Sequence, residues 1–175
     1  SSLDKFAYGV FESVIDDPNT SDNVTRVVFC SGKVYFDLLD EKEKLNATDV
    51  AIIRIEELYP FPKEHVSALI KKYSNALVWL WVQEEPQNMG AWSFVRDQIN
   101  VPELQVVARR RTATTAVGLS AIHKLEQQEI IQKVFKPCTC DRKLKYCGLQ
   151  CITGKERLKI LKQREYLLKF KNDLL

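Results

Sequence analysis

The stretch WLWVQEEPQNMGAWSF, residues 79–94, decides the fold, because its apolar run ends at paired carboxylates and resumes after a glycine. Residues 76–82 are continuously apolar, a pattern typical of a strand that is buried on both faces of a sheet. Pro86 to Asn88 suit a turn, and Gly90 permits close backbone approach before the next helix. The stretch therefore predicts a strand that leads into a site-like turn.

Outward from this stretch, apolar strands alternate with segments that carry apolar residues at helical spacing. The predicted strands are residues 26–30, 50–55, 77–82 and 104–108, and the predicted helices are residues 34–45, 63–73, 90–99 and 120–135, the last capped by Ser120. This alternation predicts an α/β fold, a three-layer α/β/α arrangement with a mainly parallel sheet. In such a fold the carboxyl ends of the strands meet at one edge, where ligands or partners usually bind.

Composition and charge divide the chain into a body and a tail. With 175 residues, of which 45% are hydrophobic, the chain can build one solid core and a small appendage. No apolar run reaches the roughly 20 residues that a membrane-spanning helix needs, so no membrane partner is expected. Residues 1–135 carry 15 basic and 19 acidic side chains, net −4, whereas residues 136–175 carry 11 and 4, net +7. We therefore predict a boundary near Lys136 and Pro137, followed by a small helical, cysteine-containing tail.

Two adjacent carboxylates follow the predicted strand of residues 77–82. Such neighbours can act as a general acid and base when one pKa is raised. Neighbours on an extended chain point to opposite faces, however, which favours a structural role. We therefore predict an interface turn made of Glu84, Glu85, Asn88, Gly90 and Trp92. Its aromatic residue, Trp92, is expected to lie in the core and at a dimer contact.

Arg109, Arg110 and Arg111 lie where a predicted strand ends, ahead of a threonine-rich loop and a helix N-terminus. That setting suits a phosphate or a carboxylate, so an effector site is one interpretation. Charge runs are more often solvated or paired, which favours an interdomain ion-pairing role. Both interpretations remain open from the sequence.

Four cysteines of the tail, Cys138, Cys140, Cys147 and Cys151, fall within fourteen residues and are enough for one tetrahedral zinc site. Their spacing differs from that of usual zinc knuckles, because one residue separates the first pair and no helix-borne histidine follows. Zinc, disulfides in an oxidising compartment and incidental thiols are therefore three alternatives. After Lys155, paired apolar residues recur every seven residues and predict a narrow amphipathic helix.

Three segments resemble, in order and spacing, the C-terminal domain of 2-oxoglutarate dehydrogenases, the thiamine-diphosphate-dependent decarboxylating component. They are CSGKVYFDLL at 30–39, DVAIIRIEELYPFP at 49–62 and WVQEEPQNMGAWSFV at 81–95. The resemblance continues through Arg109, Ala113, Ala116, Gly118 and His123 to EQQEIIQKVF at 126–135. It implies a linker from an upstream domain over residues 1–24 and a transketolase-like C-terminal domain over 25–136. It says nothing of the basic cysteine-containing extension over 137–175.

The resemblance implies that the whole enzyme oxidatively decarboxylates 2-oxoglutarate and passes the succinyl group to a lipoyl carrier in the tricarboxylic acid cycle. Its thiamine diphosphate and magnesium are expected on upstream domains, which hold the metal-diphosphate motif and the activating glutamate. No catalytic residue is therefore assigned to this chain, and the fragment is expected to be inactive alone. Its expected work is to complete a homodimer and position the upstream domains. The dihydrolipoyl succinyltransferase component is a further expected partner.

A rival interpretation is a stand-alone, non-catalytic binding module that uses the basic cysteine tail to engage nucleic acid or a protein. We prefer the enzyme domain and do not expect nucleic-acid binding. Because the chain opens on Ser1 rather than on a methionine, we expect a processed or truncated piece of a longer protein. The expected compartment is the cytoplasm in a bacterium and the mitochondrial matrix in a eukaryote.

Overall fold

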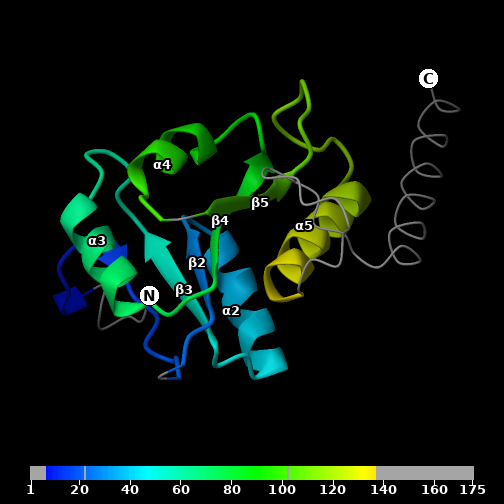
Figure 1. Ribbon diagram of the computed structural model, residues 1–175. Helices are drawn as coiled ribbons and strands as arrows, with labels where there is room; N and C mark the ends of the chain where they lie inside the picture. The colour runs from blue at the N-terminus through cyan, green and yellow to red at the C-terminus, as the bar shows by residue number, and fades with distance from the viewer. Residues whose placement is uncertain (1–6, 22, 102, 137–175) are drawn as a thin grey trace, which may run out of the picture.

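A computed structural model describes residues 7–21, 23–101 and 103–136 of the chain (Figure 1). These residues form one sheet with helices on both of its faces. The strands are β1 (Val14–Ile15), β2 (Arg26–Cys30), β3 (Val50–Ile55), β4 (Val78–Pro86) and β5 (Leu104–Arg109). The helices are α2 (Val34–Leu45), α3 (Lys63–Lys72), α4 (Trp92–Gln98) and α5 (Ser120–Phe135).

The strand order across the sheet is β1-β3-β2-β4-β5. Strands β2 to β5 are parallel to one another, whereas β1 runs antiparallel to β3. The mainly parallel sheet predicted from the sequence is therefore confirmed. Its four parallel strands end on the same side of the molecule, at Cys30, Ile55, Pro86 and Arg109. We call this side the carboxyl edge.

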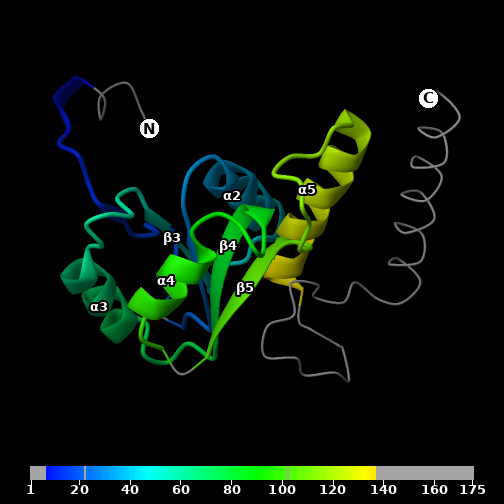
Figure 2. The same cartoon turned by 90° about the horizontal axis from the view of Figure 1, so that it is seen from above.

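Two apolar cores lie on opposite faces of the sheet, as the alternation of side chains along β2 shows. Val27 and Phe29 pack with residues of α3 and α4, whereas Val28 and Cys30 pack with residues of α2 and α5. All four side chains are 0% exposed, so this strand is buried on both faces. Figure 2 shows the two pairs of helices on either side of the sheet. The three-layer α/β/α arrangement is thus confirmed.

Strand β4 is longer than the sequence predicted. The prediction ended the strand at Val82, where the apolar run stops, but β4 continues through Glu84 and Glu85 to Pro86. Its pairing with β5 changes register between Val82 and Pro86. Backbone pairing, rather than apolar character, thus sets the end of this strand. Both glutamates lie on the strand itself, and the turn occupies residues 87–91.

The segment before β2, predicted as a linker over residues 1–24, contributes to the sheet. Its two-residue strand β1 pairs with the end of β3, Val14 facing Ile55. Shortly after β1 in the sequence, the buried carboxylate of Asp17 accepts hydrogen bonds from Lys42 Nζ at 2.6 Å and from the Ile52 amide at 2.8 Å. Two residues are too few to show an alternating pattern, so the sequence did not reveal this strand.

The last helix, α5, begins at Ser120 itself, and Leu119 occupies the N-cap position without a side-chain cap hydrogen bond. The predicted capping by Ser120 is therefore wrong. None of the helices in the described ranges is long and apolar enough to cross a membrane. The predicted helical, cysteine-containing tail over residues 137–175 lies outside the described residues.

Candidate functional site

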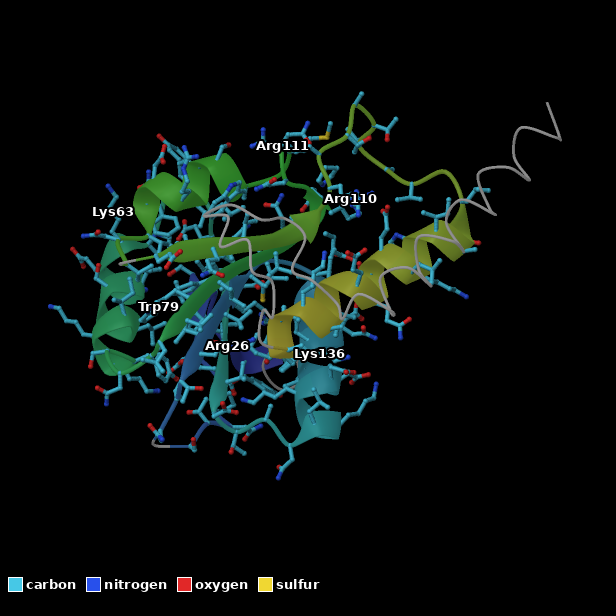
Figure 3. The ribbon with its side chains drawn as sticks, turned by 45° about the vertical axis from the view of Figure 1, so that its right-hand side comes forward. Arg26, Lys63, Trp79, Arg110, Arg111 and Lys136 are labelled. Atoms are coloured by element: carbon cyan, nitrogen blue, oxygen red, sulfur yellow. The ribbon has the colours of Figure 1, made fainter. Side chains whose placement is uncertain are left out.

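The loops at the carboxyl edge hold the residues that the sequence singled out. One is the turn after β4, and the other follows β5 and carries the arginine run. Figure 3 shows Arg110 and Arg111 at this edge, far from Arg26 and Lys136 at the opposite side of the sheet. The predicted interface turn and the predicted arginine run are therefore neighbours in space.

A single buried side chain, that of Gln83, organises the turn after β4. Its Oε1 accepts hydrogen bonds from Trp81 Nε1 at 2.9 Å and from the Trp92 amide at 3.0 Å. Its Nε2 donates to the carbonyl oxygens of Pro86 at 3.1 Å and Met89 at 2.7 Å. An amide side chain offers two acceptor sites and two donors, and all four are used here. The turn is therefore held from within by a residue that is only 4% exposed.

Gly90 closes this turn with a backbone conformation that side chains rarely adopt, at a φ of +67°. A Cβ atom at this position would lie 3.0 Å from Gln83 Nε2 and 3.1 Å from Glu85 Cβ. The torsion angle strains any residue with a Cβ at this position, and the tight space adds to the preference for glycine. The expected close backbone approach at Gly90 is thus present in the structure, and the neighbour it approaches is Gln83.

The two adjacent carboxylates do not form an acid–base pair. Glu84 Oε1 lies 3.5 Å from Lys33 Nζ, just before the start of α2. Glu85 is exposed and lies beside Gly90, ahead of α4. Because α2 and α4 cover opposite faces of the sheet, the two carboxylates point away from each other. Their arrangement suits a structural role.

Arg109 uses its guanidinium group to fasten three segments together. Its Nε donates to the Glu84 carbonyl oxygen at 2.5 Å, and its Nη2 donates to the Thr115 carbonyl oxygen at 2.8 Å. Its Nη1 lies 3.7 Å from Glu126 Oε2 of α5, and both side chains are 13% exposed. Arg109 therefore holds the loop after β5 against the end of β4 and leaves little of its charge to a ligand.

The other two arginines have different surroundings. Arg110 lines a small cavity of about 10 Å³ with Glu126, Glu129 and Lys133, and its buried Nε lacks a hydrogen-bond partner among the described residues. Arg111 is exposed, and its Nε donates to Gln87 Oε1 at 3.3 Å. The three guanidinium groups thus do not converge on one point.

Asn88 links the turn after β4 to the loop after β5, because its side-chain amide pairs with the backbone of Thr112. Its Nδ2 donates to the Thr112 carbonyl oxygen at 3.0 Å, and its Oδ1 accepts from the Thr112 amide at 3.2 Å. The Gln87 amide also donates to the Arg109 carbonyl oxygen at 3.0 Å. Both loops at this part of the carboxyl edge therefore form one hydrogen-bonded unit.

The sequence missed the part played by Gln83, although it held a signal. A glutamine directly after the apolar run WLWV occupies a strand position that is buried, and buried amides need hydrogen-bond partners. The contacts of Trp92 add to this picture, since it is 4% exposed and packs in the core. Its predicted core role is confirmed, and its predicted dimer contact stays a prediction.

Metal binding was predicted only for the tail. Within the described ranges, no group of three or more histidine, cysteine, aspartate or glutamate side chains is placed to hold a metal ion. Cys138, Cys140, Cys147 and Cys151 lie outside those ranges. The described residues also do not fit the magnesium and diphosphate of thiamine diphosphate, so no step of that chemistry is assigned to them.

The fold, with its mainly parallel five-stranded sheet, defines an α/β domain of the transketolase C-terminal type. The family described as 2-oxoglutarate dehydrogenase C-terminal matches residues 1–135. The chain therefore belongs to the family of C-terminal domains of 2-oxoglutarate dehydrogenases.

Similar proteins include E1 components from a eukaryote and from bacteria. A probable 2-oxoadipate dehydrogenase complex component E1 homolog of Dictyostelium discoideum is 41% identical over 144 residues, 77% of this chain and 16% of that protein. The 2-oxoglutarate dehydrogenase E1 component of Cupriavidus necator is 42% identical over 142 residues, 77% of this chain and 15% of that protein. That of Haemophilus influenzae is 42% identical over 139 residues, 75% of this chain and 15% of that protein. The chain thus spans about one sixth of the length of these relatives.

Proposed function

We propose that this chain is the dimer-forming C-terminal domain of an E1 component that oxidatively decarboxylates 2-oxoglutarate. The whole enzyme then transfers the succinyl group to the lipoyl carrier of the dihydrolipoyl succinyltransferase component, within the tricarboxylic acid cycle. In this proposal the chain is inactive alone and positions the upstream catalytic domains. Thiamine diphosphate and magnesium are bound upstream.

The preorganised carboxyl edge is the observation that carries this proposal. The side chains of Gln83, Arg109 and Asn88 donate hydrogen bonds to backbone carbonyl oxygens of nearby segments. They are therefore not directed at a space that a substrate could fill. Catalytic sites need a general acid, base or nucleophile that faces a reacting group. The adjacent carboxylates of Glu84 and Glu85 point away from each other and do not form such a pair. A fixed surface of this kind suits contact with another domain.

The decisive experiment uses the gene that encodes this chain. A contiguous thiamine-diphosphate domain before Ser1 supports the proposal, and a start codon directly before Ser1 contradicts it. The complete product should release carbon dioxide from 2-oxoglutarate in the presence of thiamine diphosphate and magnesium, whereas the 175-residue chain should not. 2-Oxoadipate should be assayed beside 2-oxoglutarate, because one relative is named for that substrate.

A second candidate is a stand-alone binding module, which the net charge of +7 over residues 136–175 favours. In that case the chain binds an acidic partner with an affinity that falls steeply as salt rises. If the four tail cysteines bind zinc, metal analysis should find about one equivalent per chain. Free titration of all four thiols contradicts zinc binding. For the enzyme, we propose the cytoplasm in a bacterium and the mitochondrial matrix in a eukaryote.

A further inference from the structure

Arg110, the first residue after β5, carries a buried hydrogen-bond donor that is not matched by an acceptor. Its Nε atom has no hydrogen-bond partner among the described residues, although the residue as a whole is only partly buried. Figure 3 shows this side chain where β5 ends. Nearly all buried polar groups in folded proteins bind another protein group or an ordered water. The Nε donor of Arg110 therefore points to a ligand that accepts a hydrogen bond.

The cavity that Arg110 lines lies between β5 and α5, and two carboxylates of α5 form part of its lining. Glu126 and Glu129 are three residues apart and therefore share one face of the helix. Glu129 Oε1 lies 2.6 Å from Lys133 Nζ. Glu126 Oε2 lies 3.7 Å from Arg109 Nη1. An ionised carboxylate has about four acceptor sites, so both groups can accept further hydrogen bonds.

The size of the cavity limits what it can hold. Its volume is about 10 Å³, which is at the lower limit of the roughly 10–15 Å³ that one water molecule needs. Pockets for organic ligands are larger, from about 300 Å³ upward. Small cavities that stay empty have apolar walls, whereas a bound water needs about two to four polar partners. The guanidinium of Arg110 and the two carboxylates supply partners of both kinds.

Two other ways of satisfying the Arg110 donor fit this geometry less well. A direct bond from Nε to Glu126 or Glu129 is not formed, although both carboxylates line the same cavity. A chloride ion is larger than a water molecule and would lie beside two carboxylates, which repel an anion strongly in a partly buried site. A water molecule accepts from the guanidinium and donates to the carboxylates, so it matches each group of the lining.

We propose that the cavity between β5 and α5 binds one water molecule, which accepts a hydrogen bond from Arg110 Nε and donates to the carboxylates of Glu126 and Glu129. The water joins the first residue of the loop after β5 to the last helix, beside the direct contact that Arg109 makes with the same helix. A water-mediated contact of this kind is nearly as favourable in enthalpy as a direct hydrogen bond. This inference is independent of the proposed function, because it concerns only contacts within the domain.

The direct test is a high-resolution crystal structure of the 175-residue chain. One peak of electron density should lie within about 3 Å of Arg110 Nε and of a carboxylate oxygen of Glu126 or Glu129. Crystals soaked in bromide distinguish the two kinds of occupant, because a bound anion gives an anomalous signal and a water does not. A dry cavity, an anomalous peak, or a direct bond from Nε to either carboxylate would overturn the proposal.

A measurement in solution tests the same site with Arg110→Met, and Arg111→Met on the adjacent, exposed residue is the charge-matched control. Magnetic relaxation dispersion of the water signal counts the water molecules that stay inside the protein for long times. Arg110→Met should lower that count by about one per chain, because the water loses its donor and an apolar side chain takes the place of the guanidinium. Arg111→Met should leave the count unchanged. Equal counts in the two variants would contradict a water held by Arg110.

Discussion

Gly90 lies directly against the side chain of Gln83, so that a Cβ at position 90 would come within 3.0 Å of Gln83 Nε2. The two residues fix the shape of the turn after β4, where Asn88 in the turn and Glu85 on the preceding strand are exposed. A turn held in this way loses little conformational freedom when a partner covers it, and preorganised surfaces bind more tightly for that reason. Gln83, which holds this turn from within, is therefore distinct from the exposed residues that a partner would touch.

Replacing Gln83 by leucine should destabilise the domain by about 3 kcal/mol. The change leaves the carbonyl groups of Pro86 and Met89 and the amide of Trp92 without their partner, and an unsatisfied buried group costs roughly 1–3 kcal/mol. Urea denaturation of the 175-residue chain measures the change in unfolding free energy. Gln128→Leu, on the exposed face of α5, is the control and should change stability by less than about 0.5 kcal/mol. Equal effects of the two changes would show that Gln83 does not hold the turn.

Gly90→Ala should cost about 2 kcal/mol. The left-handed backbone alone costs an alanine roughly 1–2 kcal/mol, and the added Cβ crowds Gln83 and Glu85. Gly118→Ala is the matched control, because no atom lies within 4 Å of its added Cβ and its φ is not positive. Thermal denaturation should show a clear loss for the first variant and almost none for the second. A similar melting temperature for both would contradict the assigned strain.

The sequence predicted the layers of the fold well and the connections at the carboxyl edge poorly. The strand Arg26–Cys30 is buried on both faces, so its apolar run was a sufficient signal. The end of β4 was missed because the apolar run stops at Val82, whereas backbone pairing with β5 resumes at Pro86, and side-chain polarity gives no guide to such pairing. Likewise, the three arginines are adjacent in the sequence, which gives them the same expected role. Only the tertiary contacts show that Arg109 holds neighbouring segments together whereas Arg111 is exposed.

Removing one partner of the ion pair between Lys42 and Asp17 should destabilise the domain strongly, because both residues are 4% exposed. Lys42→Met leaves a buried carboxylate without its cation, a change that costs about 3–5 kcal/mol. Lys44→Met, whose side chain is 68% exposed, should have almost no effect. In a double-mutant cycle with Asp17→Asn, the two changes should be less than additive. Additive losses in urea denaturation would mean that the two side chains do not interact.

Burial raises the pKa of the Cys30 thiol strongly, with Arg54 lowering it and Glu56 raising it to smaller extents. The folded state therefore keeps this proton above pH 9, where the thiol of the unfolded chain, with its ordinary pKa of 9.0, releases it. The contribution of this thiol to the free energy of unfolding is complete below pH 9. Above pH 9 it falls by up to about 1.4 kcal/mol per pH unit. Replacement by alanine should flatten that fall. Alkylation at pH 8 should spare Cys30 until urea unfolds the chain.

Arg109→Lys tests whether the arginine run fastens loops or binds an effector. A lysine cannot reproduce bonds to the carbonyl groups of Glu84 and Thr115 together with the contact to Glu126, so a loss of about 1–3 kcal/mol is expected. Trypsin should also cleave the loop of residues 110–119 faster. Arg111→Lys keeps an exposed charge and should leave stability and cleavage unchanged. If a phosphate-bearing effector such as a nucleotide binds here instead, its effect on the activity of the intact enzyme should fall in Arg110→Ala while the stability of the chain stays constant. Loss of stability in Arg109→Lys, with activation unaffected by Arg110→Ala, identifies this run as part of the fixed surface.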